Sequence, residues 1–159
     1  MKKVVFICTG NTCRSPMARG IMDKLLREKF PSLQDRIEIE TAGLMAFEGA
    51  PASDGAISVM AEVGVDLSSH EAQMVSQEVL DSADWVLTMT KGHRECIYGQ
   101  YDQPRDIYTL YEYVGEEKDV LDPFGGEIEI YRECRDELEG VIIRIIDMIK
   151  AEINHNNVS

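Results

Sequence analysis

Short apolar runs alternate along the chain with longer stretches of helical period. The runs are rich in β-branched residues and predict strands at residues 3–7, 36–41, 84–89 and 107–109. The longer stretches repeat apolar residues every three or four positions and predict helices at about 16–30, 53–64, 92–98 and 127–153. This alternation predicts an α/β fold: a single domain with a doubly wound, four-stranded parallel sheet and helices on both faces.

Length and composition fit one folded domain. The chain has 159 residues, 44% of them hydrophobic, which is enough for one buried core. The domain is expected over residues 1–153, followed by a frayed polar tail at residues 154–159. The formal net charge of −13 opposes binding to phosphate backbones and anionic lipid surfaces. Neither nucleic acid nor a membrane is therefore an expected partner.

The start of the chain and its cysteines indicate the compartment. Only the apolar residues 4–7 follow the amino-terminal lysines, which is short of the roughly 7–15 residues of a signal-peptide core. No run approaches the roughly 18 apolar residues of a membrane span. We therefore expect a cytoplasmic protein with reduced thiols. No C-x-x-C pair or other ligand cluster is present, so we expect no metal and no organic cofactor.

The segment between the first strand and the first helix carries the candidate chemistry. It reads Cys8-Thr9-Gly10-Asn11-Thr12-Cys13-Arg14-Ser15 and lies where a doubly wound fold binds its ligand. Backbone N–H groups in such a loop attract a tetrahedral oxyanion, and the planar guanidinium of Arg14 can donate two hydrogen bonds to its oxygens. The same donors favour the thiolate form of Cys8, a candidate nucleophile. With one glycine, Gly10, the loop fits neither a Walker loop nor a dinucleotide fingerprint. A cysteine such as Cys8, taken alone, is more often a small buried side chain, and an arginine such as Arg14 is more often a solvated cation. Their combination in one strand-to-helix loop favours a catalytic site.

This C-x5-R-S pattern, with a downstream Asp122-Pro123 pair, resembles the low-molecular-weight protein tyrosine phosphatase family. The resemblance extends from Val4 to the last predicted helix and implies a cysteine-dependent phosphatase. It implies that Cys8 attacks phosphorus while Arg14 and the loop amides hold the phosphoryl oxygens. Asp122 would protonate the leaving group and then activate water.

The resemblance also implies supporting roles around the loop. Ser15 would hydrogen-bond Cys8 and ease departure of the thiolate. Asn11 would fix the loop backbone through a network with the hydroxyl of Thr41 and with His70. Cys13 would form a reversible disulfide with the nucleophile and protect it from overoxidation.

Thr12 indicates which phosphorylated side chain is the substrate. Tyrosine-directed members carry Ile here, whereas the string Cys-Thr-Gly-Asn-Thr-Cys-Arg-Ser resembles the bacterial protein arginine phosphatases. A glycine follows Phe124, where tyrosine-directed members usually add a second aromatic residue. We therefore expect hydrolysis of phosphoarginine on proteins, with Thr12 and Phe124 setting specificity and phosphotyrosine as the alternative. An acidic rim with Asp122 and Glu127 or Glu48 would suit a cationic guanidinium.

Other functions share parts of this pattern. An arsenate reductase would need two further cysteines near residues 80–95, where only Cys96 is close. A phosphocysteine carrier or a non-catalytic phosphate-binding module would not need Arg14, Ser15 and Asp122 together. His93 and His155 are expected to be ordinary surface residues, and Cys96 and Cys134 are expected to be core or surface positions without a chemical role. The oligomeric state stays open.

Overall fold

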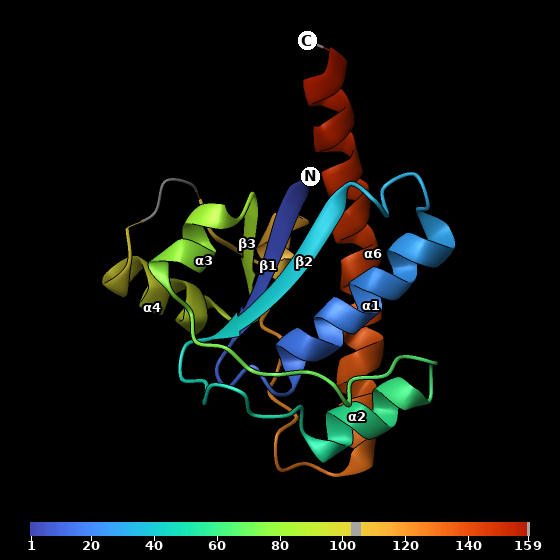
Figure 1. Cartoon of the computed structure of the whole chain (residues 1–159), viewed down its shortest axis with the longest axis vertical. Helices are drawn as coiled ribbons and strands as arrows, with labels where there is room; N and C mark the ends of the chain where they lie inside the picture. The colour runs from blue at the N-terminus through green and yellow to red at the C-terminus, as the bar shows by residue number, and fades with distance from the viewer. Residues whose placement is uncertain (103–105, 159) are drawn as a thin grey trace.

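A computed structural model describes residues 1–102 and 106–158 (Figure 1). The strands form one sheet: β1 (Lys2–Cys8), β2 (Ile37–Gly43), β3 (Trp85–Thr88) and β4 (Tyr108–Thr109). The strand order is β2-β1-β3-β4 and every pairing is parallel. The prediction of a four-stranded parallel sheet is therefore confirmed.

The first strand is central and buried on both faces. Val4 and Phe6 belong to one apolar core, and Val5 and Ile7 belong to a second core on the opposite face. Successive side chains of a strand point to opposite faces, so a strand covered on both sides needs a continuous apolar run. This explains why the run at 3–7 is unbroken instead of alternating with polar residues.

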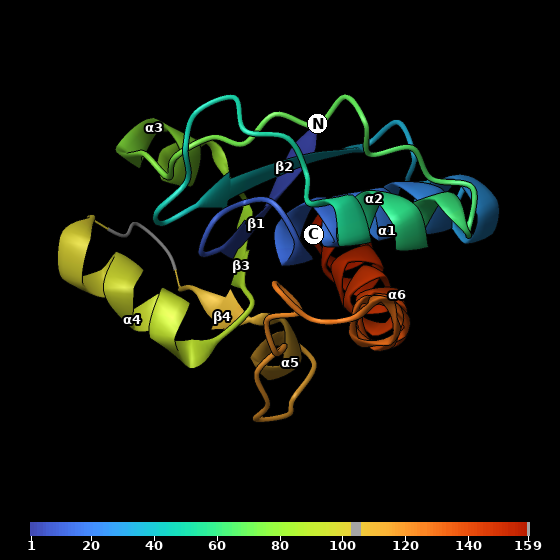
Figure 2. The ribbon, with the colours of Figure 1, turned by 90° about the horizontal axis from the view of Figure 1, so that it is seen from below.

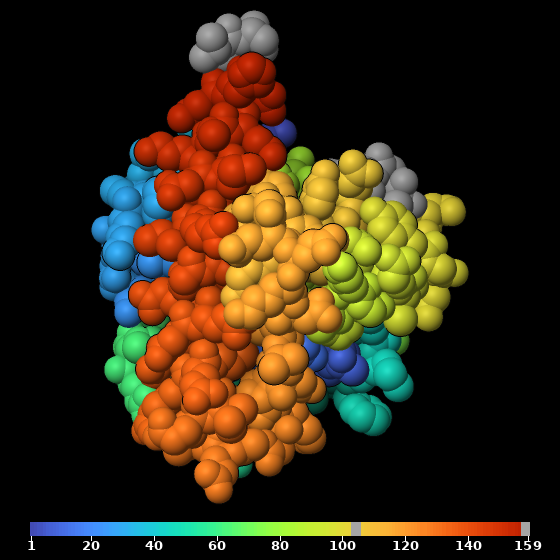
Figure 3. All heavy atoms as spheres, turned by 180° about the vertical axis from the view of Figure 1, so that it is seen from behind, coloured from blue at the N-terminus to red at the C-terminus, as the bar shows by residue number. Residues whose placement is uncertain are grey.

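The helices cover both faces of the sheet, as predicted. They are α1 (Arg14–Lys29), α2 (Asp54–Ala61), α3 (Gln77–Ser82), α4 (Lys91–Gln100), α5 (Leu110–Tyr113) and α6 (Ile128–Val158). In Figure 2, α1, α2 and α6 lie on one side of the strands, and α3 and α4 lie on the other. The helix α6 packs against α1, α2 and α5, and it extends along the whole height of the face seen in Figure 3.

The structure differs from the predicted elements mainly at their ends. The first helix begins at Arg14 instead of near Pro16, and β2 continues to Gly43. The predicted tail is helical as far as Val158, and residue 159 lies outside the described residues. Ile153 is buried and anchors this end of α6, and each further residue adds a backbone hydrogen bond without new nucleation. The short helices α3 and α5 were not predicted, because six and four residues show too little of a helical period.

Parallel pairing brings the carboxyl ends of the strands to one edge of the sheet. Cys8, the last residue of β1, pairs in register with Gly43, the last residue of β2. The loops after these strands gather at the lower end of the molecule in Figure 1. Among the described helices, none has the length and apolar character that crossing a bilayer requires.

Candidate functional site

The loop of residues 8–15 connects the end of β1 to the start of α1. Cys8 is buried at the base of the loop, and Arg14 and Ser15 are the first two residues of the helix. Leu44 N–H donates to the Cys8 carbonyl (3.1 Å), and Met45 N–H donates to the Thr9 carbonyl (2.9 Å). These bonds hold the loop against the chain that leaves β2. Its own N–H groups and the positive end of α1 can therefore face a bound anion.

Asn11 holds the loop in an unusual backbone conformation. Its φ is 57°, and it is the one non-glycine residue with positive φ among residues 1–102 and 106–158. Asparagine tolerates this left-handed region better than most side chains. Asn11 Nδ2 donates to Ser15 Oγ (2.7 Å), and Asn11 Oδ1 accepts from Gln73 N–H (2.9 Å). His70 Nε2 donates to the Asn11 carbonyl (2.7 Å). Two distant residues, Gln73 and His70, thus hold the side-chain oxygen and the backbone carbonyl of Asn11, and Ser15 of the same loop accepts from its Nδ2.

The support from Thr41 differs from the expectation. Thr41 is buried, but its contact with this network is made by its backbone carbonyl and not by its hydroxyl. The carbonyl accepts from Gln73 Nε2 (2.8 Å), and Gln73 in turn binds Asn11 through its backbone N–H. The expectation that the Thr41 hydroxyl takes part in this network was therefore wrong. Gln73 is the missing link, and no local pattern marks a residue on a distant loop as a partner of Asn11.

Ser15 contacts the nucleophile candidate. Its Oγ lies 3.0 Å from Cys8 Sγ, and both residues are buried. Ser15 Oγ already accepts a hydrogen bond from Asn11 Nδ2, so its own proton is available for the sulfur. A donor at this distance stabilises a negatively charged sulfur. The side chain of Ser15 thus links the backbone support of the loop to its thiol.

Arg14 joins the loop to the segment that carries Asp122. Its Nη1 donates to the Val120 carbonyl (2.8 Å), and its Nη2 lies 3.7 Å from Asp122 Oδ2. The Val120 N–H donates to the Met89 carbonyl at the end of β3 (2.9 Å), which ties this segment to the sheet. Asp122 Oδ1 accepts from the Phe124 N–H (3.0 Å), so the backbone turn at the Asp-Pro pair orients the carboxylate.

These groups border one cavity of about 310 Å³. Its lining contains Cys8, Arg14 and Asp122 together with Thr12 and Phe124, so the predicted candidates meet at one place. The remaining lining residues are Thr9, Gly10, Cys13, Met45, Phe47 and Ala50.

The wall of this cavity differs from the expected acidic rim. Neither Glu48 nor Glu127 lines the cavity, so Asp122 is its one lining carboxylate among the residues that the structure describes. Glu48 instead accepts from the Met74 N–H (2.8 Å). Met45 and Phe47 form an apolar wall that was not predicted, since exposed apolar residues in a loop follow no periodic pattern. Phe47 is 84% exposed and Phe124 is 70% exposed, so both rings are available to a ligand.

The cysteines have different surroundings. All four are free in the structure. The Cys13 thiol donates to Ser53 Oγ (3.2 Å) and lies 3.6 Å from the Tyr131 hydroxyl. Burial raises the pKa of Cys134 to about 12, so this thiol stays protonated, and Cys96 is exposed on α4.

Gly43 allows the close approach of the loop to the sheet. A Cβ at this position would lie 2.6 Å from the Thr9 carbonyl oxygen and 2.9 Å from the Asn11 nitrogen. Both are backbone atoms, which cannot move aside as a flexible side chain can. This close packing could not be predicted from the sequence, because a single glycine does not show which segment will pack on it.

His93 was expected to be a surface residue, and this expectation was wrong. The side chain belongs to α4 but turns inward, with a residue exposure of only 7%. Its Nε2 lies 2.8 Å from Thr9 Oγ1 in the loop. Burial, helped by the Arg14 guanidinium, lowers the pKa of His93 to about 4, so the ring is neutral near pH 7. His155, in contrast, is exposed on α6 as expected.

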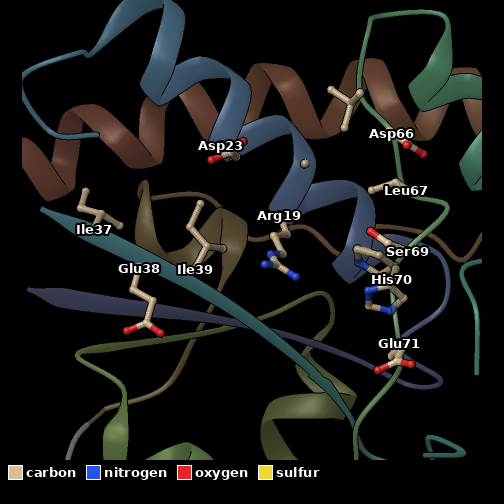
Figure 4. A pocket seen from close by; sticks show the side chains of 13 residues that line it. Arg19, Asp23, Ile37, Glu38, Ile39, Asp66, Leu67, Ser69, His70 and Glu71 are labelled. Atoms are coloured by element: carbon tan, nitrogen blue, oxygen red, sulfur yellow. The ribbon is translucent and has the colours of Figure 1, made fainter. Parts of the chain in front are cut away.

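A second, larger cavity of about 640 Å³ adjoins the loop support. Figure 4 shows Arg19 of α1 and Glu38 of β2 around it, together with His70. Burial lowers the pKa of His70, although its hydrogen bond to Asn11 opposes this shift. None of residues 8–15 lines this cavity, so the groups suited to phosphate chemistry lie at the smaller one.

A loop whose backbone N–H groups and arginine can bind an oxyanion, above a buried cysteine, is typical of a cysteine-dependent phosphatase on an α/β sheet. No cluster of metal-ligating side chains occurs within the described parts of the chain. A family profile described as low molecular weight phosphotyrosine protein phosphatase matches residues 3–156. The chain belongs to this family.

Individual relatives agree with this assignment. A protein-arginine-phosphatase of Geobacillus stearothermophilus is 39% identical over 152 residues, which cover 94% of this chain and 97% of that protein. The low molecular weight protein-tyrosine-phosphatase PtpB of Staphylococcus epidermidis is 34% identical over 143 residues, covering 90% and 96%.

Solved structures show the same fold. A low molecular weight protein tyrosine phosphatase from T. tengcongensis matches with a TM-score of 0.85 and 41% identity, covering 92% of this chain and 99% of that one. A mutant of the arginine phosphatase YwlE with a phosphorylated active site serine matches with a TM-score of 0.87 and 37% identity, covering 93% and 95%.

Proposed function

We propose that the protein hydrolyses phosphoarginine on protein substrates through a cysteinyl-phosphate formed at Cys8. The observation that carries this proposal is the cavity that Cys8, Arg14 and Asp122 share, with Thr12 in its lining. Relatives named protein-arginine-phosphatase, 39% and 38% identical, support arginine as the phosphorylated residue. The YwlE structure with a phosphorylated active site serine supports a covalent intermediate on the enzyme.

In the first step, the Cys8 thiolate attacks phosphorus and the bond between phosphorus and the guanidine nitrogen breaks. Arg14 and the loop N–H groups hold the phosphoryl oxygens, on which charge is spread in a loose transition state. Asp122 gives its proton to the departing nitrogen, so arginine leaves as the guanidinium cation. The 3.7 Å between Asp122 and Arg14 supports this role, since it keeps acid and phosphoryl site adjacent.

In the second step, water attacks the cysteinyl-phosphate. Asp122, now a carboxylate, accepts a proton from the attacking water, and the bond between sulfur and phosphorus breaks. The products are inorganic phosphate and the Cys8 thiolate. The Ser15 hydroxyl, 3.0 Å from Cys8 Sγ, supports this step because it stabilises the departing thiolate.

Thr12 is the proposed specificity residue, with Phe124. The Thr12 carbonyl accepts from the Ser53 N–H (2.9 Å), which fixes the residue at the cavity. A Cβ on Gly10 would lie 3.5 Å from Thr12 Oγ1, so the hydroxyl is close to the loop backbone that would hold the phosphoryl group. A hydroxyl there can bind a polar guanidine nitrogen, whereas Ile in its place could not.

Phosphotyrosine is the second candidate substrate. The exposed rings of Phe47 and Phe124 both line the cavity and could stack on a phenyl ring. Relatives named protein-tyrosine-phosphatase, 34% identical, share most of the chain. In either case we propose a cytoplasmic reaction, because the nucleophile needs a reduced thiol. We also propose that Cys13 protects it through a reversible disulfide.

The test is release of phosphate from a phosphoarginine peptide by the wild type, Cys8→Ser and Asp122→Asn. The wild type should release phosphate and Cys8→Ser should not. Loss of a general acid and base should slow Asp122→Asn by about 10²–10⁴-fold. Undiminished turnover in Asp122→Asn would contradict its assigned role, and a stable phosphate on Cys8 without turnover would instead favour a carrier or binding module.

A further inference from the structure

His93 reaches the phosphate loop from a different part of the fold. It is the third residue of α4, and its N–H donates to Thr90 Oγ1 (3.1 Å) at the helix start, which fixes its backbone. The imidazole Nε2 then lies 2.8 Å from Thr9 Oγ1. Thr9 follows Cys8 directly and lines the same cavity. A buried ring is thus bonded to a hydroxyl beside the proposed nucleophile.

The charged groups that face His93 keep it neutral at neutral pH. They are Arg14 in the loop, with Asp119 and Asp122 in the segment before α6. Burial and the Arg14 guanidinium lower the pKa to about 4, and the two carboxylates only partly oppose this. A neutral imidazole has one donor and one acceptor nitrogen, so its bond to Thr9 depends on which nitrogen carries the proton.

The surroundings of the second ring nitrogen favour one tautomer. Nδ1 is buried and has no hydrogen-bond partner in the part of the chain that the structure describes. If Nε2 accepted from Thr9, the proton would lie on Nδ1, leaving a buried N–H without an acceptor, which proteins rarely tolerate. With the proton on Nε2, Nδ1 is only an unused acceptor. His93 Nε2 therefore donates to Thr9 Oγ1.

This assignment leaves the Thr9 hydroxyl proton free. Because the oxygen accepts from His93, its own O–H can donate to another group. Thr9 is exposed and borders the cavity. Its hydroxyl can therefore donate to an oxygen of a phosphoryl group, or of a phosphate mimic, bound in that cavity. Backbone donors in the loop have fixed directions, whereas this donor depends on a side chain that another element orients.

We propose that His93 is a positioning residue that orients the Thr9 hydroxyl as an additional donor to the phosphoryl group bound above Cys8. This inference rests on the proposed phosphoryl chemistry at the same cavity. It adds the Thr9 side chain, from the loop after β1, to the groups that hold the oxyanion, and it assigns to His93 of α4 the orientation of that side chain. His93 itself does not touch the substrate and acts through Thr9.

The test uses orthovanadate, a phosphate mimic, whose binding is measured by calorimetry and does not need turnover. Thr9→Val and His93→Leu should each weaken orthovanadate binding by about 10- to 100-fold, the effect of one hydrogen bond to a charged group. The double variant should bind no more weakly than either single variant, since both remove the same donor. Thr9→Ser and His93→Gln, which keep a hydroxyl and an N–H at those positions, should retain most of the affinity. His155→Leu, an exposed histidine of α6, is the matched control and should bind as the wild type does.

Turnover of the phosphoarginine peptide gives a second readout. The two disruptive variants should lower kcat more than they raise KM, because the donor matters most as charge develops on the oxygens. Full orthovanadate affinity in Thr9→Val, or losses that add in the double variant, would overturn the proposal. If His93→Leu fails to fold, the comparison of Thr9→Val with Thr9→Ser decides. Orthovanadate binding without phosphoarginine turnover would refute the proposed function and still test this inference.

Discussion

Replacement of Arg14 by lysine should lower both kcat and the free energy of unfolding, and a control variant that lowers only the latter separates the two effects. The guanidinium uses Nη1 to bind the Val120 carbonyl at 2.8 Å, and its second nitrogen, Nη2, lies near Asp122. A planar fork can hold a backbone carbonyl and a phosphoryl oxygen at the same time. A lysine ammonium keeps the positive charge but is a single point, so it cannot serve both partners in these directions.

The expected magnitudes follow from the two lost contacts. A lost donor to the developing oxyanion costs about 10²–10³-fold in kcat. Val120 is fully buried, so its carbonyl would lose its partner, which costs about 1–3 kcal/mol of unfolding free energy. Arg135→Lys is the matched control, because Arg135 Nη1 also donates to a backbone carbonyl, that of Val59 (2.9 Å), on α2. It should lose comparable stability and keep its activity.

The assay is kcat and KM on a phosphoarginine peptide, together with urea unfolding of both variants. Activity within tenfold of the wild type in Arg14→Lys would refute the reasoning that the guanidinium binds the Val120 carbonyl and a phosphoryl oxygen at the same time. An equal loss of activity in Arg135→Lys would show that destabilisation, and not the missing donor, lowers turnover.

Three further predictions address the loop and its surroundings. Gly43→Ala should lower kcat/KM by at least about tenfold, because the new Cβ would meet the Thr9 carbonyl at 2.6 Å and displace the loop; wild-type kinetics would contradict this close packing. Peroxide should inactivate the wild type reversibly and Cys13→Ser irreversibly, since only the former can form the protective disulfide with Cys8; recovery of both with a thiol reductant would count against it. The pKa of His93 is about 4 in the folded protein and near 6.5 when unfolded, so its contribution to stability is complete above pH 6.5 and is lost as the pH falls towards 4. Urea unfolding at pH 7 and 4.5 should show the wild type losing about 2 kcal/mol more than His93→Gln, after allowance for solvent screening, and equal losses would refute the shift.

The sequence predicts those parts of the site that lie close together in the chain. Cys8, Arg14 and Ser15 fall within one strand-to-helix loop, so the sheet, the loop and its anion chemistry could all be inferred from a short segment. Asp122 could be placed only through the family resemblance, because its distance from the loop along the chain has no geometric meaning before folding. The structure then shows how it reaches the site, through Val120 and the end of β3.

The missed features depend on contacts between distant segments. Gln73 supports Asn11 from a loop with no regular pattern, and His93 turns inward although its neighbours on α4 are polar. An amphipathic pattern marks which face of a helix is apolar, but a polar side chain that binds a buried partner contradicts that pattern. The exposed ring of Phe47 likewise has no periodic signal, and only its place at the cavity shows its relevance.

The most direct test of the central claim compares two matched peptides, one carrying phosphoarginine and one phosphotyrosine, with the wild type and Thr12→Ile. Thr12 lines the cavity and is the residue that we assign to the choice of substrate. We predict a higher kcat/KM for phosphoarginine in the wild type and a shift towards phosphotyrosine in Thr12→Ile. A wild-type preference for phosphotyrosine would contradict the account and make this chain a tyrosine-directed member of its family.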